Sequence, residues 1–381
     1  MEYTDKKGLD KTHTIFPKSL IQSTQEKGHM PMKKAVESVQ VQPALTELSA
    51  SDSLALQTLA EDDSKLGGYA YQIIRQQSKK VFKLRSHVLA DTDPENLHQM
   101  RIGTRRLRAA LSIFGDVVDV DEAKLTKSIT KVTKSLGKVR DIDVMKAWLK
   151  SNTSELDKPE KKIIKGLLKK LKKRRKKQFA IMETALESKS FKKLSKACKK
   201  WVKQPAFAPT ASQDAAGNAI AKLIGPLTAL LRHPGWQVAT HPQSGQLKPA
   251  KSITLKRLNQ ALEADGEQLH DLRKQIKRTR YQAEFFRSLY GITYSAQIRE
   301  FRTLQTLLGS LQDQLVISDF LAAELGSDWA KQLPSIHQQF QTSRLELWQA
   351  WQPLQQKYLK LAAKLPSEKK SKQKVTEQKI A

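Results

Sequence analysis

The sequence predicts an all-α protein, and three features of the 381-residue chain indicate it. Gly and Pro are scarce, at 16 and 14 residues, whereas Ala, Leu, Lys, Gln and Glu dominate the composition. Few segments alternate with the period of two that a half-buried strand requires, whereas helical spacing of apolar residues is common. Two segments also match each other at a constant offset of 172 residues. We therefore expect two tandem, pseudo-symmetric four-helix bundles that arose by internal duplication.

The first half of the chain contains the clearest helix starts. Residues 1–65 mix polar with scattered apolar residues, so we expect them to be mostly disordered, with a possible short helix at 43–60. Helical patterning is steady from Leu66. A helix over about 95–118 follows Asp93-Pro94, with proline at its first position. Further helices are expected over 121–151 and from Asp157 through the lysine-rich stretch, which completes a first bundle at 66–203.

The second half follows a proline-rich region. We expect a helix at 213–231, a linker at 233–248, and then helices at 249–264, 266–290, 294–325 and 328–361. These form a second bundle at 213–365, so that the repeated region spans 66–365. The lysine-rich tail, 366–381, is expected to be disordered.

The charge of the chain indicates a polyanionic partner. The formal net charge is +30, and residues 66–203 carry +22 of it, against +7 for residues 204–365. Such a charge attracts nucleic acid, anionic membranes or polyphosphate. The single cysteine excludes an intrachain disulfide, and no segment resembles a signal peptide or approaches the ~20 apolar residues of a membrane span. We therefore expect a soluble cytoplasmic protein that does not enter membranes.

The repeated element is a basic helical face that begins with a histidine. His98, Arg101, Arg105 and Arg108 fall within an arc of about 80° on a helix. The same arc recurs in the second set, in His270, Arg273, Lys277 and Arg280. Because a guanidinium group matches two phosphate oxygens at once, these faces are suited to phosphate.

Lysine stripes accompany the first copy of this face. They contain Lys79 and Lys83 on the first helix, Lys131, Lys134 and Lys138 on the third, and Lys165, Lys169 and Lys172 on the fourth. If the stripes converge, they line a cationic groove for a long anion. The alternative for any one stripe is a solvated lysine face.

Other residue types leave several interpretations open. His98 and His270 either contact phosphate or bond a neighbouring helix, and the surrounding cations disfavour a metal ion. Asp141, Asp143 and Asp313 indicate acid–base or metal chemistry only weakly, and pairing with the motif arginines is the favoured role. Gly137 and Gly309 are expected to permit close helix approach. The sequence contains no P-loop and no catalytic constellation, so we expect neither an enzyme nor a cofactor.

At these residues the chain resembles the CHAD domain family, named for a histidine in an α-helical domain. The resemblance rests on His98-x-x-Arg101-x-x-x-Arg105-Arg106-x-Arg108 followed by Leu136-Gly137-x-x-Arg140-Asp141, and on the matching His270-x-x-Arg273-x-x-x-Lys277-Arg278-x-Arg280 and Leu308-Gly309-x-x-Gln312-Asp313. It implies two four-helix bundles that bind inorganic polyphosphate along a basic surface, and some members localise to polyphosphate granules. Gln312 replaces Arg140 and Leu315 replaces Asp143 in the second set. We therefore expect the first half to contribute more of the binding.

The resulting functional hypothesis is non-catalytic binding of inorganic polyphosphate, with targeting to polyphosphate granules as its use. Nonspecific nucleic-acid binding is the alternative. The resemblance implies that the histidines and basic residues of both motifs bind the anion: His98, Arg101, Arg105, Arg106, Arg108, Arg140, His270, Arg273, Lys277, Arg278 and Arg280. The lysines of the three stripes are the further candidates.

Overall fold

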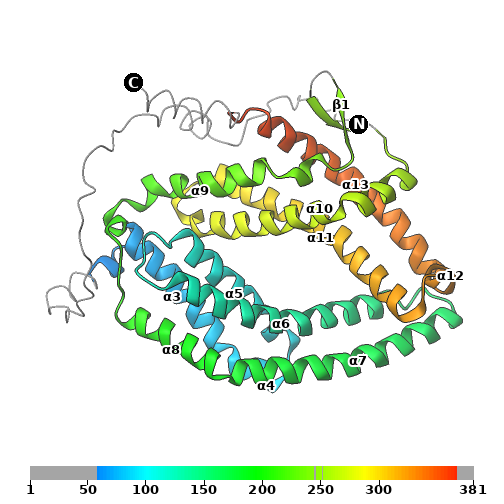
Figure 1. The fold of residues 1–381 in the computed structure, drawn as a ribbon, viewed down its shortest axis with the longest axis horizontal. Helices are drawn as coiled ribbons and strands as arrows, with labels where there is room; N and C mark the ends of the chain where they lie inside the picture. Colours follow the sequence, from blue (N-terminus) through cyan, green and yellow to red (C-terminus); the bar gives the residue numbers. More distant parts are fainter. Residues whose placement is uncertain (1–57, 244–245, 251, 367–381) are drawn as a thin grey trace, which may run out of the picture.

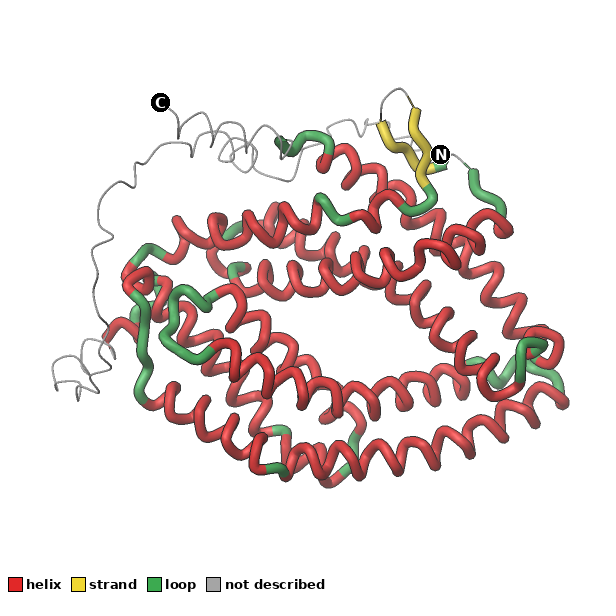
Figure 2. Tube along the Cα trace, viewed as in Figure 1, coloured by secondary structure: helices red, strands yellow, loops and turns green. Residues whose placement is uncertain are grey.

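The computed structural model describes residues 58–243, 246–250 and 252–366, and most of them are helical (Figure 2). The all-α prediction is therefore confirmed. The expectation for residues 1–65 falls mostly outside the described residues, as does the tail after Pro366. Residues 58–65 are described, and Lys65 forms a β-bridge with Asp214.

Residues 66–203 form six α-helices with short connections. They are α3 (Leu66–Lys83), α4 (Arg85–Ala90), α5 (Pro94–Ile113), α6 (Glu122–Ser151), α7 (Lys158–Glu187) and α8 (Lys189–Lys203). The second half contains α9 (Ala215–Leu231), α10 (Leu255–Phe285), α11 (Ile292–Leu325), α12 (Trp329–Gln332) and α13 (Pro334–Ala362). Short 3₁₀ segments cover Pro209–Ser212, Pro234–Gln237 and Arg287–Leu289, and a hairpin pairs β1 (Thr240–Gln243) with β2 (Gln246–Pro249).

Side-chain caps fix the helix starts that the sequence indicated. Asp93 accepts a hydrogen bond from the Glu95 backbone at the start of α5. Asp157 forms a capping box with Glu160 at the start of α7. These caps satisfy backbone N–H groups that have no partner within the helix, so each helix begins where the carboxylate lies.

Several expected boundaries are wrong. The helices expected at 249–264 and 266–290 are one helix, α10, because the buried leucines continue on one face past Gly266. Packing of that face outweighs the cost of about 1 kcal/mol for a glycine inside a helix. The lysine-rich helix, whose end had no predicted position, ends at Glu187, and Ser188 caps α8 there. The linker expected at 233–248 contains a 3₁₀ segment and nearly all of the hairpin, since β1 lies within it and β2 begins at Gln246.

Two helix ends also differ from the expectation. The helix expected over 95–118 ends at Ile113, and Val117 and Val118 are buried in the turn that follows. The helix expected over 328–361 is divided at Leu333 into α12 and α13. Pro334 begins α13, since proline lacks the N–H that a continuing helix would need.

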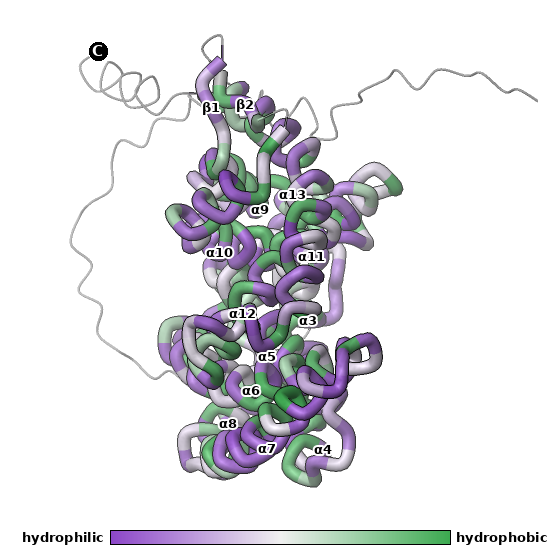
Figure 3. Tube along the Cα trace, turned by 90° about the vertical axis from the view of Figure 1, so that its right-hand side faces the viewer, coloured by the Kyte–Doolittle hydropathy of each residue, from purple (hydrophilic) through white to green (hydrophobic). Residues whose placement is uncertain are grey.

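The helices of the two halves lie side by side (Figure 1). Helices α10 and α11 run above α5 and α6, and α7 forms the lower edge; the perpendicular view in Figure 3 shows the same order of layers. The largest hydrophobic core joins residues of both halves, for example Leu107, Leu136, Ile276 and Leu304. The division into two bundles at 66–203 and 213–365 stays a prediction.

A second, smaller core closes the far end of the molecule. It joins the end of α6 and the start of α7 to the end of α11, to α12 and to the start of α13, through residues such as Leu149, Leu167, Phe320 and Ile336. The two halves thus meet at both ends. The segments of α5, α6, α10 and α11 that carry the repeated motif pack into the larger core, through residues such as Met100, Leu136 and Leu272.

Candidate functional site

Four cations of the repeated motif gather where α5 and α10 face each other. Arg101 and Arg105 come from α5, and Arg273 and Lys277 come from α10. Burial, followed by the charges of Arg273, Arg105 and Arg101, lowers the pKa of Lys277 to about 7. Burial and then the charge of Arg105 also lower the pKa of Arg101. We call Arg101, Arg105, Arg273 and Lys277 the cationic cluster.

A glycine on the next helix accommodates each of two cluster arginines. The Arg101 guanidinium lies 3.6 Å from the position that a β-carbon on Gly137 would occupy. The corresponding distance from the Arg273 Nε atom to Gly309 is 3.3 Å. Both Nε atoms are buried, and neither has a hydrogen-bond partner within the described part of the chain. The two glycines therefore make room for arginine side chains.

Two carboxylates only partly balance this positive charge. Asp141 lies 3.5 Å from Arg101, which agrees with its predicted pairing role. Asp313, on α11, acts electrostatically on Arg273 and Lys277. Four cations thus face two carboxylates, so the cluster retains a positive charge that an external anion can balance.

Asp143 has a different partner from the one expected. Its carboxylate accepts a hydrogen bond of 2.7 Å from Arg175 of α7, and Arg175 also pairs with Asp91. The prediction that Asp143 pairs with a motif arginine is therefore wrong. Its role is to hold α7 against α6, since the three residues come from three separate segments.

The two histidines border the cluster and favour the neutral form. Burial and then the charge of Arg140 lower the pKa of His98. Burial and then the charge of Lys274 lower the pKa of His270, which lies beside Gln312. Each neutral imidazole can donate one hydrogen bond to an anion and gain charge when the anion raises its pKa.

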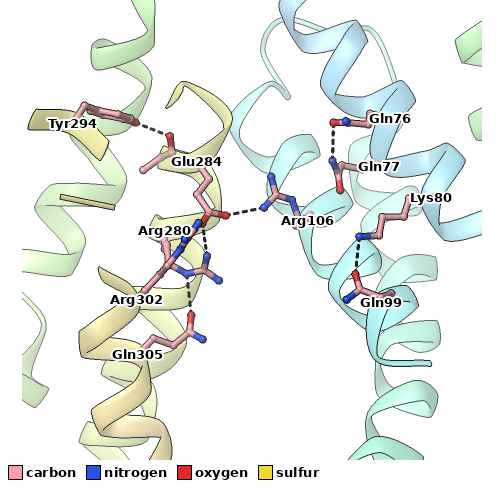
Figure 4. A network of polar contacts seen from close by, with 11 residues as sticks. Gln76, Gln77, Lys80, Gln99, Arg106, Arg280, Glu284, Tyr294, Arg302 and Gln305 are labelled. Atoms are coloured by element: carbon pink, nitrogen blue, oxygen red, sulfur yellow. Dashed lines mark hydrogen bonds and ion pairs between the residues drawn. The ribbon is translucent and has the colours of Figure 1, made fainter. Parts of the chain in front are cut away.

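Two further predicted residues, Arg106 and Arg280, belong to an ion-pair network (Figure 4). The Glu284 carboxylate accepts from Arg106 at 2.7 Å and from Arg280 at 2.5 Å, and it also accepts from Arg302 of α11 at 2.7 Å. Arg280 is buried and also donates to Gln305. The network joins α5, α10 and α11, so these two arginines hold the halves together.

Arg108 and Arg278 border a pocket beside the cluster, with a volume of about 550 Å³. Arg105 and Lys277 also line this pocket, so it is continuous with the cluster. Arg108 donates a hydrogen bond of 3.3 Å to Thr130.

The lysine stripes lie outside the cluster. Those on α6 (Lys131, Lys134, Lys138) and on α7 (Lys165, Lys169, Lys172) are exposed, and α7 forms an outer edge of the molecule (Figure 1). Lys79 and Lys83 line a shallow pocket between α3 and α8 together with Lys199 and Lys203. The structure therefore brings the histidine–arginine faces of the two motifs together. The lysines lie outside the cationic cluster and add positive charge to the surface.

Sequence reasoning missed Glu284 and Arg302. The spacing of Arg280 and Glu284 along one helix was an available signal for an ion pair. Nothing in the sequence linked Arg302 or Arg106 to them. Among the described residues, no three His, Cys, Asp or Glu side chains form a group that could hold a metal ion, and no helix is long and apolar enough to cross a membrane.

The fold and the site together define an all-helical protein in which two histidine–arginine helices bring their cations to one cluster. Comparison with protein families matches residues 72–322 to the CHAD domain. The chain belongs to the CHAD domain family, which is associated with polyphosphate binding.

Solved structures agree with this assignment. The crystal structure of the CHAD domain from the plant Ricinus communis is 25% identical, with a TM-score of 0.51 over 78% of this chain and 90% of that chain. PptA from Streptomyces chartreusis is 14% identical, with a TM-score of 0.52 over 78% of this chain and 99% of that chain, and shows the likeness of fold alone. A search of curated proteins gave no match.

Proposed function

We propose that this protein binds inorganic polyphosphate without chemical conversion, and that the cationic cluster is the centre of its binding site. The observation that carries the proposal is the gathering of Arg101, Arg105, Arg273 and Lys277 against only two carboxylates. Holding like charges together is costly, and a linear polyanion removes that cost by supplying phosphate oxygens to several cations at once.

The surroundings of the cluster support a long ligand. His98 and His270 border it, and α6, whose Gly137 lies against Arg101, carries exposed lysines. Inorganic polyphosphate carries charge on every unit and has no bases, which fits a site whose large aromatic side chains, such as Tyr281, are buried. Targeting to polyphosphate granules is the use that we propose for this binding.

Nonspecific nucleic-acid binding is the alternative, because duplex DNA is also a dense polyanion. A competition experiment at physiological salt separates the two functions. Labelled long-chain polyphosphate is bound to the full-length protein and displaced with unlabelled polyphosphate or with duplex DNA at equal phosphate concentration. The proposal predicts that DNA displaces the label at least about tenfold less effectively, and equal displacement would favour a general polyanion binder.

A further inference from the structure

Glu284 and Ser112 occupy corresponding positions in the 172-residue offset, yet their surroundings differ in charge. Glu284 lies near the end of α10, and Ser112 lies near the end of α5. The residues around Glu284 also have counterparts around Ser112: Arg106 corresponds to Arg278, Arg280 to Arg108, and Arg302 to Thr130. Two of the three arginines around Glu284 thus have an arginine as their counterpart around Ser112. The Glu284 carboxylate has none, because its counterpart is a serine.

On the Glu284 side, the carboxylate binds all three arginines at 2.5–2.7 Å. On the Ser112 side, Arg108 and Arg278 are close enough for their charges to interact. Within the described ranges, neither arginine forms an ion pair with a carboxylate of the protein. Two guanidinium groups therefore converge there without the counter-charge that their counterparts have.

The space beside these arginines is large enough for a ligand. Arg108, Ser112 and Arg278 line the pocket of about 550 Å³ described above, and Arg105 and Lys277 connect it to the cationic cluster. Glu122 and Asp271 also border the pocket, but Asp271 pairs with Lys274. Ser112 is exposed, so its hydroxyl is free to donate to a group that enters.

We propose that Arg108, Arg278 and Ser112 form a subsite for one phosphate group, which takes the place that the Glu284 carboxylate takes on the other side. The two guanidinium groups donate to the phosphate oxygens, and the serine hydroxyl donates one further hydrogen bond. The subsite rests on the proposed function, because its occupant is one unit of a polyphosphate chain that continues across Arg105 and Lys277. It adds to that function that the two sides of the site differ, since a phosphate group binds on the Ser112 side and the Glu284 carboxylate takes its place on the other.

The test introduces a carboxylate at position 112, where the corresponding position 284 has one. In a background of Arg101→Ala with Arg273→Ala, which leaves the subsite intact, tripolyphosphate is titrated by calorimetry and its effect on Tm is recorded. Ser112→Glu is then added, with Ser112→Gln as a control of equal size and no charge. We expect Ser112→Glu to raise the Tm without ligand and to weaken tripolyphosphate binding at least about tenfold, and Ser112→Gln to do neither.

Equal tripolyphosphate affinities in the Ser112→Glu and Ser112→Gln proteins would overturn the subsite. The subsite would also be overturned if the wild-type protein bound tripolyphosphate and the double-alanine background did not. If Ser112→Glu fails to fold, Arg278→Gln in the same background gives the answer, since this exposed side chain is not part of the core. It should weaken tripolyphosphate binding about tenfold with little change in the ligand-free Tm, and an unchanged affinity would overturn the proposal.

Failure of the proposed function gives a different result, because the wild-type protein would then not bind long-chain polyphosphate.

Discussion

Arg273 lies across Gly309 so closely that a β-carbon on the glycine would come within 3.3 Å of the arginine Nε atom. The equivalent approach of Arg101 to Gly137 leaves 3.6 Å, an ordinary van der Waals contact. The two glycines thus set how far each guanidinium lies from the neighbouring helix. Because both glycines are inside helices, alanine at either position should favour the helix itself by up to about 1 kcal/mol.

This difference predicts unequal effects of two small substitutions. Gly137→Ala should raise the Tm and leave polyphosphate affinity unchanged, because the added methyl group fits. Gly309→Ala should stabilise less and weaken binding, because Arg273 has to move by a few tenths of an ångström. Thermal unfolding and a binding isotherm for each variant measure both effects, and a larger loss of affinity in Gly137→Ala would contradict the geometry.

The lowered pKa of Lys277 predicts that polyphosphate affinity depends on pH. Its pKa in the ligand-free protein is about 7, and phosphate oxygens beside it favour the charged form. Binding should therefore take up a proton, and affinity should fall as the pH rises from about 6.5 to 8.5. Lys277→Arg, which stays charged, should have a flatter profile over the same range, whereas parallel profiles would exclude Lys277 as the titrating contact.

The same residue predicts a pH-dependent effect on stability. The unfolded chain has the ordinary lysine pKa of 10.5, so between pH 7 and 10.5 it binds a proton that the folded protein lacks. Lys277 therefore makes folding more favourable as the pH rises through this window. Lys277→Met should raise the free energy of unfolding most at pH 6 and progressively less toward pH 9. Denaturant titrations of both proteins give this difference, and an advantage that grows with pH would contradict the reasoning.

The ion pairs of Glu284 predict that replacing this residue lowers the stability of the fold, as an effect separate from polyphosphate binding. Burial opposes its ionisation, but the hydrogen bond from Arg302 and the charges of Arg280 and Arg106 outweigh burial and lower its pKa. Glu284→Gln leaves three arginines without their counter-ion and should cost about 3 kcal/mol of unfolding free energy at neutral pH. This contribution is present above the unfolded pKa of about 4.5 and disappears as the pH falls through the folded value. A cost that persists unchanged in acid would mean that the carboxylate charge is not the cause.

The two helices should contribute unequally to binding. The α5 pair supplies two guanidinium groups, which proteins do not deprotonate. On α10, much of Lys277 is neutral at pH 8 because its pKa is about 7. Arg101→Ala with Arg105→Ala should therefore weaken polyphosphate binding more at pH 8 than Arg273→Ala with Lys277→Ala. The expectation from sequence also favoured the first half. Equal losses in the two double variants at this pH would contradict the ranking.

The sequence was sufficient for much of this arrangement, and its failures have physical causes. Asp93 and Asp157 signalled helix starts because capping is a local interaction. The histidine–arginine arc predicted the cationic faces because helical period alone determines which side chains share a face. The pairing of Asp143 with Arg175 and the convergence of Arg106, Arg280 and Arg302 on Glu284 join separate helices, and no local pattern encodes such contacts. The break expected near Gly266 failed because buried leucines on either side kept α10 continuous.

Net charge is the main competing explanation for polyanion binding, so it needs a matched control. Lys161 and Lys173 of α7 are exposed, and within the described part of the chain neither forms an ion pair. Lys170 is unsuitable, because it pairs with Glu324 at 2.9 Å. Lys161→Ala with Lys173→Ala removes two positive charges, the same number as Arg101→Ala with Arg273→Ala, but leaves the cationic cluster unchanged.

The most direct measurement is the affinity of long-chain polyphosphate for these two double variants and the wild-type protein, at physiological salt and with circular dichroism to confirm folding. The central claim is that Arg101 and Arg273 bind phosphate directly. It predicts a loss of about 100-fold in the double-arginine variant, since each charge-assisted contact contributes roughly tenfold, and a loss of less than about threefold in the lysine control. Similar losses in the two folded variants would contradict the claim and show that overall charge determines binding.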